Sequence, residues 1–302
     1  MRRIIIFYIW LPVMLSATKY AGEFQELGVG GRPCAMGGAG VAQYVDASVI
    51  YFNPAGSFYT EKSVMAMHAE NFAGVVKNEF ASVVIPGENR SVGIGVQYLS
   101  VSDIILTTLS DTTSPPGSGN PPVPYDTVGT RDVVLYFNGA KGNAELAYGM
   151  NIKIFYRDLS VIKGFGGGID LGVVYNREYF SVGAAIRDFI LAPIIWNNEN
   201  KTKETIMPKF SVGIAPVLPM DKINSTLKFE CDVVKPFDID GFNINMGVEY
   251  GYKDFLFGRA GHYNGNYTFG AGIRYKKFSL DYALVLHSEL NNSNKVSAGV
   301  TF

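Results

Sequence analysis

Apolar and polar residues alternate along most of this chain, and this pattern restricts the fold more than any other feature of the sequence. In residues 90–100, Val92, Ile94 and Val96 share one face, whereas glycines and Gln97 lie on the other. Because successive side chains of a strand point to opposite faces, each such segment is a strand between two different environments. The same pattern recurs over residues 144–156, 169–175, 180–186, 210–216, 227–233, 244–252, 267–275, 278–286 and 296–302.

A soluble β-sandwich would also alternate, but three features favour a membrane barrel. The apolar faces carry tyrosine and phenylalanine near their ends, as aromatic girdles at a membrane interface require. The segments run about nine to twelve residues, which is the length that a tilted strand needs to cross a bilayer. The opposite faces carry charges that suit a wet lumen: Lys153, Asp170, Arg187, Lys228, Glu230, Asp232, Glu249, Arg274 and Asp281.

The connections between the strands support the same fold. About fourteen strands fit into residues 62–302, and short periplasmic turns with longer outer loops are typical of such barrels. Connections after even-numbered strands are short, whereas those after odd-numbered strands include 102–130, 191–205 and 288–295. We therefore expect an all-β protein, a transmembrane antiparallel β-barrel with both termini in the periplasm.

One predicted strand breaks the pattern. Phe255 and Phe257 should face lipid, and Arg259 shares their parity. A charge at mid-membrane costs about 2 to 4 kcal/mol. Either a bulge at Gly258 turns Arg259 inward, or Arg259 lies at the membrane interface.

The first residues predict export. Two arginines precede an apolar run over residues 4–15, and small residues follow it. This run is too short to span a membrane as a helix, and it matches a secretory signal peptide over residues 1–17. The protein is therefore expected in the bacterial outer membrane.

Composition and side-chain spacing exclude several functions. The net charge of -1 gives no sign of nucleic-acid binding. Cys34 and Cys231 are too few for a disulfide framework, and free thiols are favoured over a single bridge. His287 stands beside Ser288, but neighbours on a strand point to opposite faces and do not form a catalytic pair. No cluster has metal-ligand spacing. We expect no catalytic residue, no metal and no cofactor.

The segment before the first strand, residues 18–61, has a distinct composition. Its stretch "GVGGRPCAMGGAGVAQYVDASVIYFNPAG" is too apolar and glycine-rich to be a solvated tail. Gly37 and Gly38 allow close approach to a barrel wall, so we expect this segment to fold into the lumen as a plug. Asn53 followed by Pro54 predicts a turn, which we expect to belong to the plug. The alternative is that Asn53 only caps a turn that leads into the first strand.

This stretch resembles the opening of the PorV/PorQ family of outer-membrane barrels, which belongs to the FadL-like group. Phe52 and Cys34 depart from that pattern, which usually has tryptophan and a small residue there. The resemblance implies a fourteen-stranded barrel with an N-terminal plug, and Phe302 resembles the terminal signal read by barrel-assembly machinery. The plug motif would include Arg32, Gly37, Gly38, Asp46, Asn53, Pro54 and Ala55.

The resemblance implies two functions that one fold can serve. PorV-type members act in type IX protein secretion, where they carry cargo to a surface attachment step, and we expect this role because the opening motif is closest to that branch. The alternative is a FadL-like channel for hydrophobic small molecules. The implied partners are outer-membrane lipid, the assembly machinery, and either secreted cargo and secretion components or a hydrophobic ligand.

Two outer loops are candidates for the contact surface. The stretch 102–130 is rich in proline and is not expected to continue its flanking strands. In the second loop, Ile194, Ile195 and Trp196 are apolar residues with no assigned membrane face. Exposed apolar residues mark contact sites, so we expect these loops to meet cargo or to gate a ligand. Folding over the barrel mouth is the alternative.

Overall fold

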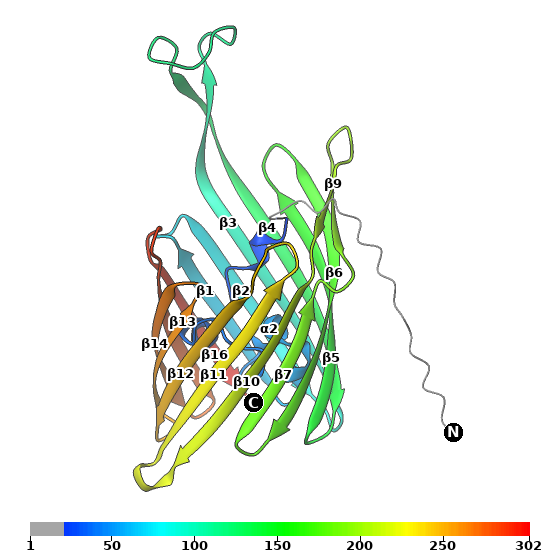
Figure 1. The fold of residues 1–302 in the computed structure, drawn as a ribbon, viewed down its shortest axis with the longest axis vertical. Coiled ribbons are helices and arrows are strands. Elements are labelled where there is room, and N and C mark those ends of the chain that lie inside the picture. The colour runs from blue at the N-terminus through cyan, green and yellow to red at the C-terminus, as the bar shows by residue number, and fades with distance from the viewer. Residues whose placement is uncertain (1–20) are drawn as a thin grey trace, which may run out of the picture.

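A computed structural model describes residues 21–302 and shows one antiparallel sheet that closes on itself (Figure 1). The sheet has 16 strands, of which β8 (Ala192–Trp196) and β9 (Lys203–Ile206) form a hairpin beside β6. The other fourteen form the barrel, and pairing of β1 with β16 closes it. None of the helices in residues 21–302 is long and apolar enough to cross a membrane. The predicted signal peptide lies outside the described residues.

The barrel strands are β1 (Ser63–Asn71), β2 (Val76–Pro86), β3 (Arg90–Leu109), β4 (Pro122–Gly142), β5 (Leu146–Asp158), β6 (Lys163–Arg177), β7 (Phe180–Arg187), β10 (Lys209–Met220), β11 (Ser225–Pro236), β12 (Asn243–Tyr252), β13 (Leu256–Tyr263), β14 (Asn266–Tyr275), β15 (Phe278–Leu286) and β16 (Ser293–Thr301).

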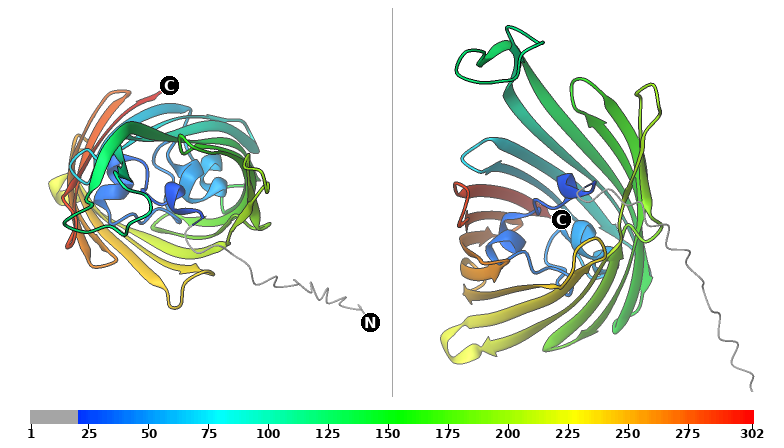
Figure 2. Two further views of the ribbon diagram at one scale, coloured as in Figure 1. Left: turned by 90° about the horizontal axis from the view of Figure 1, so that it is seen from above. Right: turned by 45° about the horizontal axis from the view of Figure 1, so that its top comes forward.

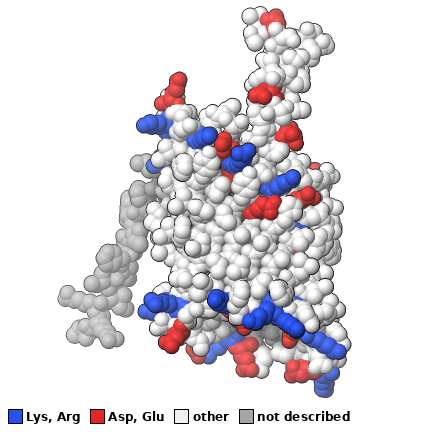
Figure 3. Space-filling model, turned by 180° about the vertical axis from the view of Figure 1, so that it is seen from behind, with Lys and Arg blue, Asp and Glu red and all other residues white. Residues whose placement is uncertain are grey.

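The predicted alternation sorts side chains between the two faces of the wall. In β5, Leu146, Tyr148 and Met150 are exposed on the outside, whereas Asn151 and Lys153 are buried on the inside. On the face of the molecule that Figure 3 shows, charged side chains gather in an upper and a lower band, and a nearly uncharged belt lies between them. Such a belt suits the hydrocarbon core of a bilayer. The fold class predicted from the sequence is confirmed.

Connections differ in length at the two ends of the barrel. At one end, here named the turn end, the strands are joined by residues 87–89, 143–145, 178–179, 221–224, 253–255 and 276–277. Phe302 lies at the turn end too, where its backbone N–H donates a hydrogen bond to the carbonyl oxygen of Lys62 at 2.8 Å. The opposite end, named the loop end, carries the β3–β4 connection and residues 188–208.

The stretch 102–130 is a projecting hairpin, which corrects the expectation that proline ends the strands there. β3 and β4 stay paired up to Leu109 and Pro122, with two register shifts, and extend well beyond the barrel (Figure 1). Pro124 lies opposite Thr107. A projecting two-stranded ribbon has a free edge on each strand, so proline can lack an N–H there without breaking the ladder.

β13 carries Arg259 into the lumen without a bulge. Its pairing is regular along both edges, and Arg259 and Phe257 are both buried. The expectation that Phe257 faces lipid is therefore wrong, and Arg259 does not lie at the interface. The guanidinium groups of Arg259 and Arg274 lie 5.4 Å and 5.1 Å from the centroid of the Phe257 ring. These cation–π contacts stabilise an aromatic ring in a charged lumen.

Residues 21–60, named the N-terminal segment below, lie inside the barrel (Figure 2). They form four short helical turns: η1 (Glu23–Gln25), α1 (Gly31–Ala35), α2 (Val49–Phe52) and η2 (Pro54–Phe58). Most residues of the segment are buried. Turns this short leave most of their backbone groups without a partner inside the helix, so the partners must come from the wall.

Candidate functional site: the filled lumen

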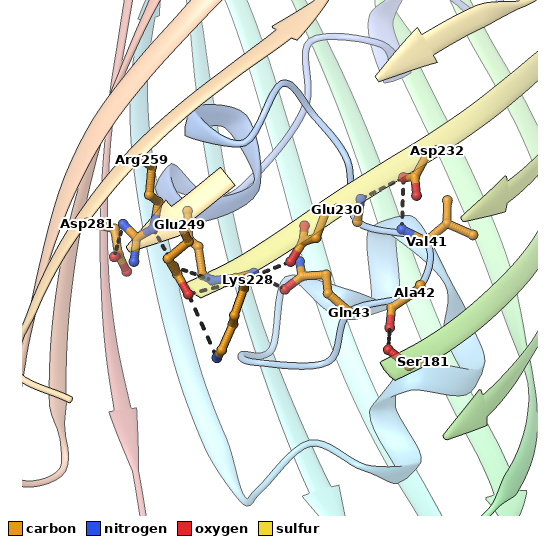
Figure 4. Close-up of polar contacts among 12 residues, drawn as sticks. Val41, Ala42, Gln43, Ser181, Lys228, Glu230, Asp232, Glu249, Arg259 and Asp281 are labelled. Carbon is orange, nitrogen blue, oxygen red and sulfur yellow. Dashed lines mark hydrogen bonds and ion pairs between the residues drawn. The ribbon is translucent and has the colours of Figure 1, made fainter. Parts of the chain in front are cut away.

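Polar side chains of the wall bind the backbone of the N-terminal segment. The Asp232 carboxylate accepts hydrogen bonds from the backbone N–H groups of Gly40 at 2.7 Å and Val41 at 3.0 Å. On the same side of the barrel, two strands away in β7, the Ser181 hydroxyl donates to the carbonyl oxygen of Ala42 at 2.7 Å (Figure 4). The wall thus supplies the partners that a coiled backbone lacks.

Close approach of the two backbones depends on glycine. The Gly37 N–H donates to the Thr268 hydroxyl at 3.0 Å, and Gly37 has a φ of +68°. A Cβ on Gly37 would lie 2.4 Å from the Met246 carbonyl oxygen, and one on the wall residue Gly261 would lie 2.2 Å from the Gly37 nitrogen. Glycine is therefore needed on both sides of this contact.

Arg32 is the most strongly bound side chain of the segment. Its guanidinium donates to Glu249 at 2.9 Å and to Glu230 at 2.8 Å, and it also bonds with Gln43 of the segment (Figure 4). Arg32 is 2% exposed. Burial lowers the pKa of Arg32, but Glu230 and Glu249 outweigh it and hold the pKa above its usual value. Arg32 therefore stays charged.

The Arg32 contacts belong to a larger ion cluster that spans several strands. Arg259 donates to Glu249 at 2.6 Å and to Asp281 at 2.7 Å. Figure 4 shows this chain of charges between the segment and the wall. Buried charges are tolerated only when they are paired, so each member of the cluster depends on its neighbours.

Asn53 joins the segment to itself and to the wall. Its side-chain N–H₂ donates to the carbonyl oxygen of Val41 at 2.8 Å and to that of Val173 at 3.1 Å, and its oxygen accepts from the Ala55 N–H at 3.1 Å. Pro54, next in the chain, accepts from the side chain of Asn138 at 3.1 Å. Asn53 therefore caps η2 and also binds the wall.

Two other residues of the predicted motif differ from each other. Gly38 contacts the wall, where its carbonyl oxygen accepts a hydrogen bond from the side chain of Asn245 at 3.3 Å. Asp46 accepts a hydrogen bond from the N–H of Ser48 at 2.8 Å, within the segment. A Cβ on Gly38 would meet only the side chain of Asn245, at 3.6 Å. The motif is therefore divided between residues that fix the segment to the wall and residues that shape the segment itself.

A second ion cluster lies along β5 and β6. Lys153 is 2% exposed and lies 2.8 Å from Asp170 and 2.7 Å from Asp188. Its ammonium also donates to Gln25 of the segment at 3.0 Å. The sequence identified Lys153 and Asp170 as lumen residues, but their partner in the segment had no sequence signal.

Glu26 forms a third anchor near the loop end. It pairs with Arg187 at 3.0 Å and with Lys209. Desolvation raises the pKa of Glu26, but the two cations outweigh it and lower the pKa to about 2. A carboxylate whose pKa is lowered by folding stabilises the folded state at pH values above its ordinary pKa. This stabilisation is lost as the pH falls toward 2. Because the Glu26 side chain is 43% exposed, solvent screens this pair, and the anchor weakens as the carboxylate becomes protonated.

An apolar cluster fills another part of the lumen. Phe24 of the segment and Phe155 of the wall meet edge to face, with ring centroids 5.6 Å apart. Ile50 and Phe80 belong to the same buried cluster, and so does Trp196 of β8. The segment is therefore held in the lumen by apolar packing as well as by ion clusters.

Two cavities lie on either side of the segment. The loop-end cavity has a volume of about 300 Å³ and is lined in part by Gly38 and Val41. The turn-end cavity has a volume of about 470 Å³ and is lined in part by Tyr44 and Asp46. Residues 38–46 and α1 therefore lie between the two cavities, since Cys34 also lines the loop-end cavity and Arg32 the turn-end cavity.

The predicted contact residues of the 191–205 stretch are mostly buried, which corrects the expectation of an exposed apolar surface. Ile194 is 0% exposed and Trp196 is 4% exposed, whereas Ile195 is 52% exposed. β8 pairs with β6, and the rings and methyl groups of Ile194 and Trp196 face Gly164 and the apolar cluster. Ile194 and Trp196 therefore pack into the buried apolar cluster beside β6, and only Ile195 stays exposed.

The different burial of the neighbours Ile194 and Ile195 allows a matched pair of substitutions. Ile194→Ser is expected to lower the free energy of unfolding by about 2 to 5 kcal/mol, because it leaves a cavity in the apolar cluster. Ile195→Ser, at the exposed neighbour, should change it by about 0.5 kcal/mol or less. Thermal unfolding of both variants in detergent measures the difference. Equal melting temperatures would show that β8 does not pack on the barrel as described.

The cysteines do not form a disulfide, and His287 bonds with a serine other than its neighbour Ser288. Cys34 and Cys231 are both free thiols, and burial raises the pKa of Cys34. His287 bonds with Ser293 at 2.9 Å rather than with its neighbour Ser288. Within residues 21–302, no group of three or more His, Cys, Asp or Glu side chains is placed to hold a metal ion.

No protein-family model and no curated protein sequence matches this chain. Among solved structures, it is similar to the toluene transporter TbuX of Ralstonia pickettii, with a TM-score of 0.62 and 14% identity over 91% of this chain and 98% of that one. It is also similar to the CymD monoaromatic hydrocarbon channel, with a TM-score of 0.63 and 14% identity over 91% of this chain and 98% of that one. For the Pseudomonas putida toluene transporter TodX, the TM-score is 0.56 and the identity is 13%, over 90% of this chain and 97% of that one. The chain therefore has the fold of the FadL-like outer-membrane barrels.

Proposed function

We propose that this protein is an outer-membrane channel for small hydrophobic molecules, closed at rest by its N-terminal segment. The observation that carries this proposal is a closed barrel whose lumen holds a segment between two cavities, in a fold shared with proteins described as toluene transporters and monoaromatic hydrocarbon channels. Those neighbours are transporters and channels rather than enzymes. Phe52, Val234 and Val285 in the lining of the loop-end cavity support an apolar ligand, because they give such a molecule favourable surface inside the lumen.

The proposal includes an orientation. The turn end lies in the periplasm and the loop end outside the cell, since short turns are periplasmic in bacterial barrels. The signal peptide directs export, and Phe302 at the turn end serves the assembly machinery. A ligand then enters the loop-end cavity and leaves through the turn-end cavity.

Passage requires residues 38–46 to move, because they lie between the cavities. The moving stretch is held by separate contacts, from Asp232 to Gly40 and Val41, from Ser181 to Ala42 and from Arg32 to Gln43. Arg32 itself is held by two wall carboxylates, those of Glu230 and Glu249, which do not depend on this stretch. We infer that α1 stays anchored through Arg32 while the stretch after Gly38 shifts aside. This arrangement lets the lumen open without expelling the whole segment.

Uptake measurements test the proposal. Cells that lack their own hydrophobic-compound channels, expressing this protein, should take up labelled toluene faster than cells carrying an empty vector, with sucrose entry unchanged. Ile195→Ser, at an exposed position, should transport like the wild type. Toluene entry equal to the empty-vector cells, or an equal rise in sucrose entry, would reject a hydrophobic channel.

A second candidate is the PorV-type role in type IX secretion. It is supported by the opening motif and by the projecting β3–β4 hairpin, which holds exposed Ile105 and Tyr125 far from the barrel. Removing residues 104–127 should abolish retention of surface cargo in this role and leave toluene uptake unchanged. Comparing the two activities in one variant therefore separates the candidates.

A further inference from the structure

The turn-end cavity is unusually rich in positive charge. Its lining includes five cationic side chains: Arg32, Lys228, Arg274, Lys276 and Lys277. Three carboxylates also line it, those of Asp46, Glu61 and Asp281. Within residues 21–302, only Arg32 and Lys228 of the five cations have a carboxylate oxygen within 4.0 Å. Like charges around one space repel each other, and a bound anion offsets that repulsion.

An unpartnered buried hydroxyl lies in the same lining. Ser63 is 5% exposed, and its Oγ has no hydrogen-bond partner among the described residues. The hydroxyl of Tyr59, also in the lining, is buried and unpartnered as well. Buried polar groups nearly always have a partner, so these two hydroxyls point to a polar ligand.

The cavity also reaches the lipid side of the wall. Ser63, Ser279 and Thr301 face it with small polar side chains, which leaves room at the ends of β1, β15 and β16. The outward-facing residues Val64 and Phe278, which are 44% and 63% exposed, belong to the same lining. Charged side chains, many of them Lys and Arg, gather along this lower rim of the molecule in Figure 3. A molecule with an anionic head and apolar tails fits both surfaces.

We propose that the turn-end cavity binds the phosphate group of an anionic phospholipid from the surrounding leaflet. Arg274, Lys276 and Lys277 supply charge to the phosphate, Ser63 donates its hydroxyl hydrogen, and the acyl chains lie along Val64 and Phe278. Clusters of Lys and Arg at a membrane surface attract anionic lipid in this way. Free phosphate has the same head chemistry, and the experiment distinguishes the two sources. The site does not depend on the proposed transport activity.

Native mass spectrometry of lipid retained by the barrel tests the site. The protein is reconstituted in nanodiscs of phosphatidylcholine with phosphatidylglycerol and then released. The wild type should retain phosphatidylglycerol selectively, and Lys276→Gln/Lys277→Gln should lower that selectivity by about fivefold or more per charge removed. These two lysines are exposed in a turn, so the variant should fold. Arg274→Gln and Ser63→Ala should lower it too.

The control removes equal charge from the same rim outside the cavity. Lys222→Gln/Lys253→Gln alters two other turns, and it should retain phosphatidylglycerol like the wild type. If this control loses as much selectivity for phosphatidylglycerol as the cavity variant does, general surface charge explains the binding and the site is rejected. Calorimetric binding of inorganic phosphate in phosphatidylcholine nanodiscs, without phosphatidylglycerol selectivity, would reject the lipid and assign a soluble anion instead.

Discussion

Deleting residues 21–60, while keeping the signal peptide, is expected to raise the ion conductance of the barrel roughly tenfold or more. The fourteen-strand wall closes through β1 and β16 without any residue of the segment. A barrel of this size leaves an aqueous channel when its interior is not filled by protein. Current through single barrels in a planar lipid bilayer measures the change.

A second deletion serves as the control for this result. Removing residues 110–121, the tip of the projecting hairpin, takes away exposed residues and no lumen contact. That variant should conduct like the wild type. If the segment deletion leaves both conductance and thermal stability unchanged, the segment is a leader and does not close the lumen.

Replacing Arg32 by alanine is expected to lower the free energy of unfolding by about 3 to 5 kcal/mol, because it leaves Glu230 and Glu249 buried beside each other without their shared cation. Arg32→Lys should retain only part of the stability that Arg32→Ala loses, since an ammonium group lacks the planar guanidinium geometry that binds two carboxylates at once. Thermal unfolding in detergent, with a folded-barrel gel shift as a second readout, measures the effect.

A double variant tests whether the loss comes from the unpaired carboxylates. Arg32→Met with Glu230→Gln removes one charge of each sign and should be more stable than Arg32→Ala, since Glu249 keeps its contact with Arg259. Arg90→Ala, at an exposed rim position, should change stability by about 0.5 kcal/mol or less. An Arg32→Ala variant as stable as the wild type would mean that the ion cluster does not hold the segment.

The barrel itself was predictable because strand alternation is a local signal. Val92, Ile94 and Lys153 take the faces that their parity assigns, and the turns fall where short polar connections predict them. The contents of the lumen were only partly predictable. Lumen charges such as Glu249 could be identified from parity, but their pairing with Arg32 joins residues 217 positions apart and leaves no trace in local sequence.

The errors have a common physical cause, which is tertiary packing that overrides a local preference. Phe257 faces the lumen because two guanidinium groups stack on its ring. Ile194 and Trp196 are buried because β8 pairs with β6 and closes over the apolar cluster. One helpful signal was present, since the wall glycines Gly213 and Gly247 stand between apolar residues where the segment approaches the wall.

A cysteine pair tests most directly whether the N-terminal segment fills the lumen. The hydroxyl oxygens of Ser57 in η2 and Ser91 in β3 lie 2.8 Å apart, so two cysteines at these positions need little movement to form a disulfide. In a background without Cys34 and Cys231, Ser57→Cys/Ser91→Cys should cross-link nearly completely on mild oxidation of the intact protein, as a shifted band on a non-reducing gel. Ser57→Cys with Ser100→Cys, on the opposite face of β3, should stay reduced. No cross-link in the first pair, or equal cross-linking in both, would contradict a segment held inside the barrel.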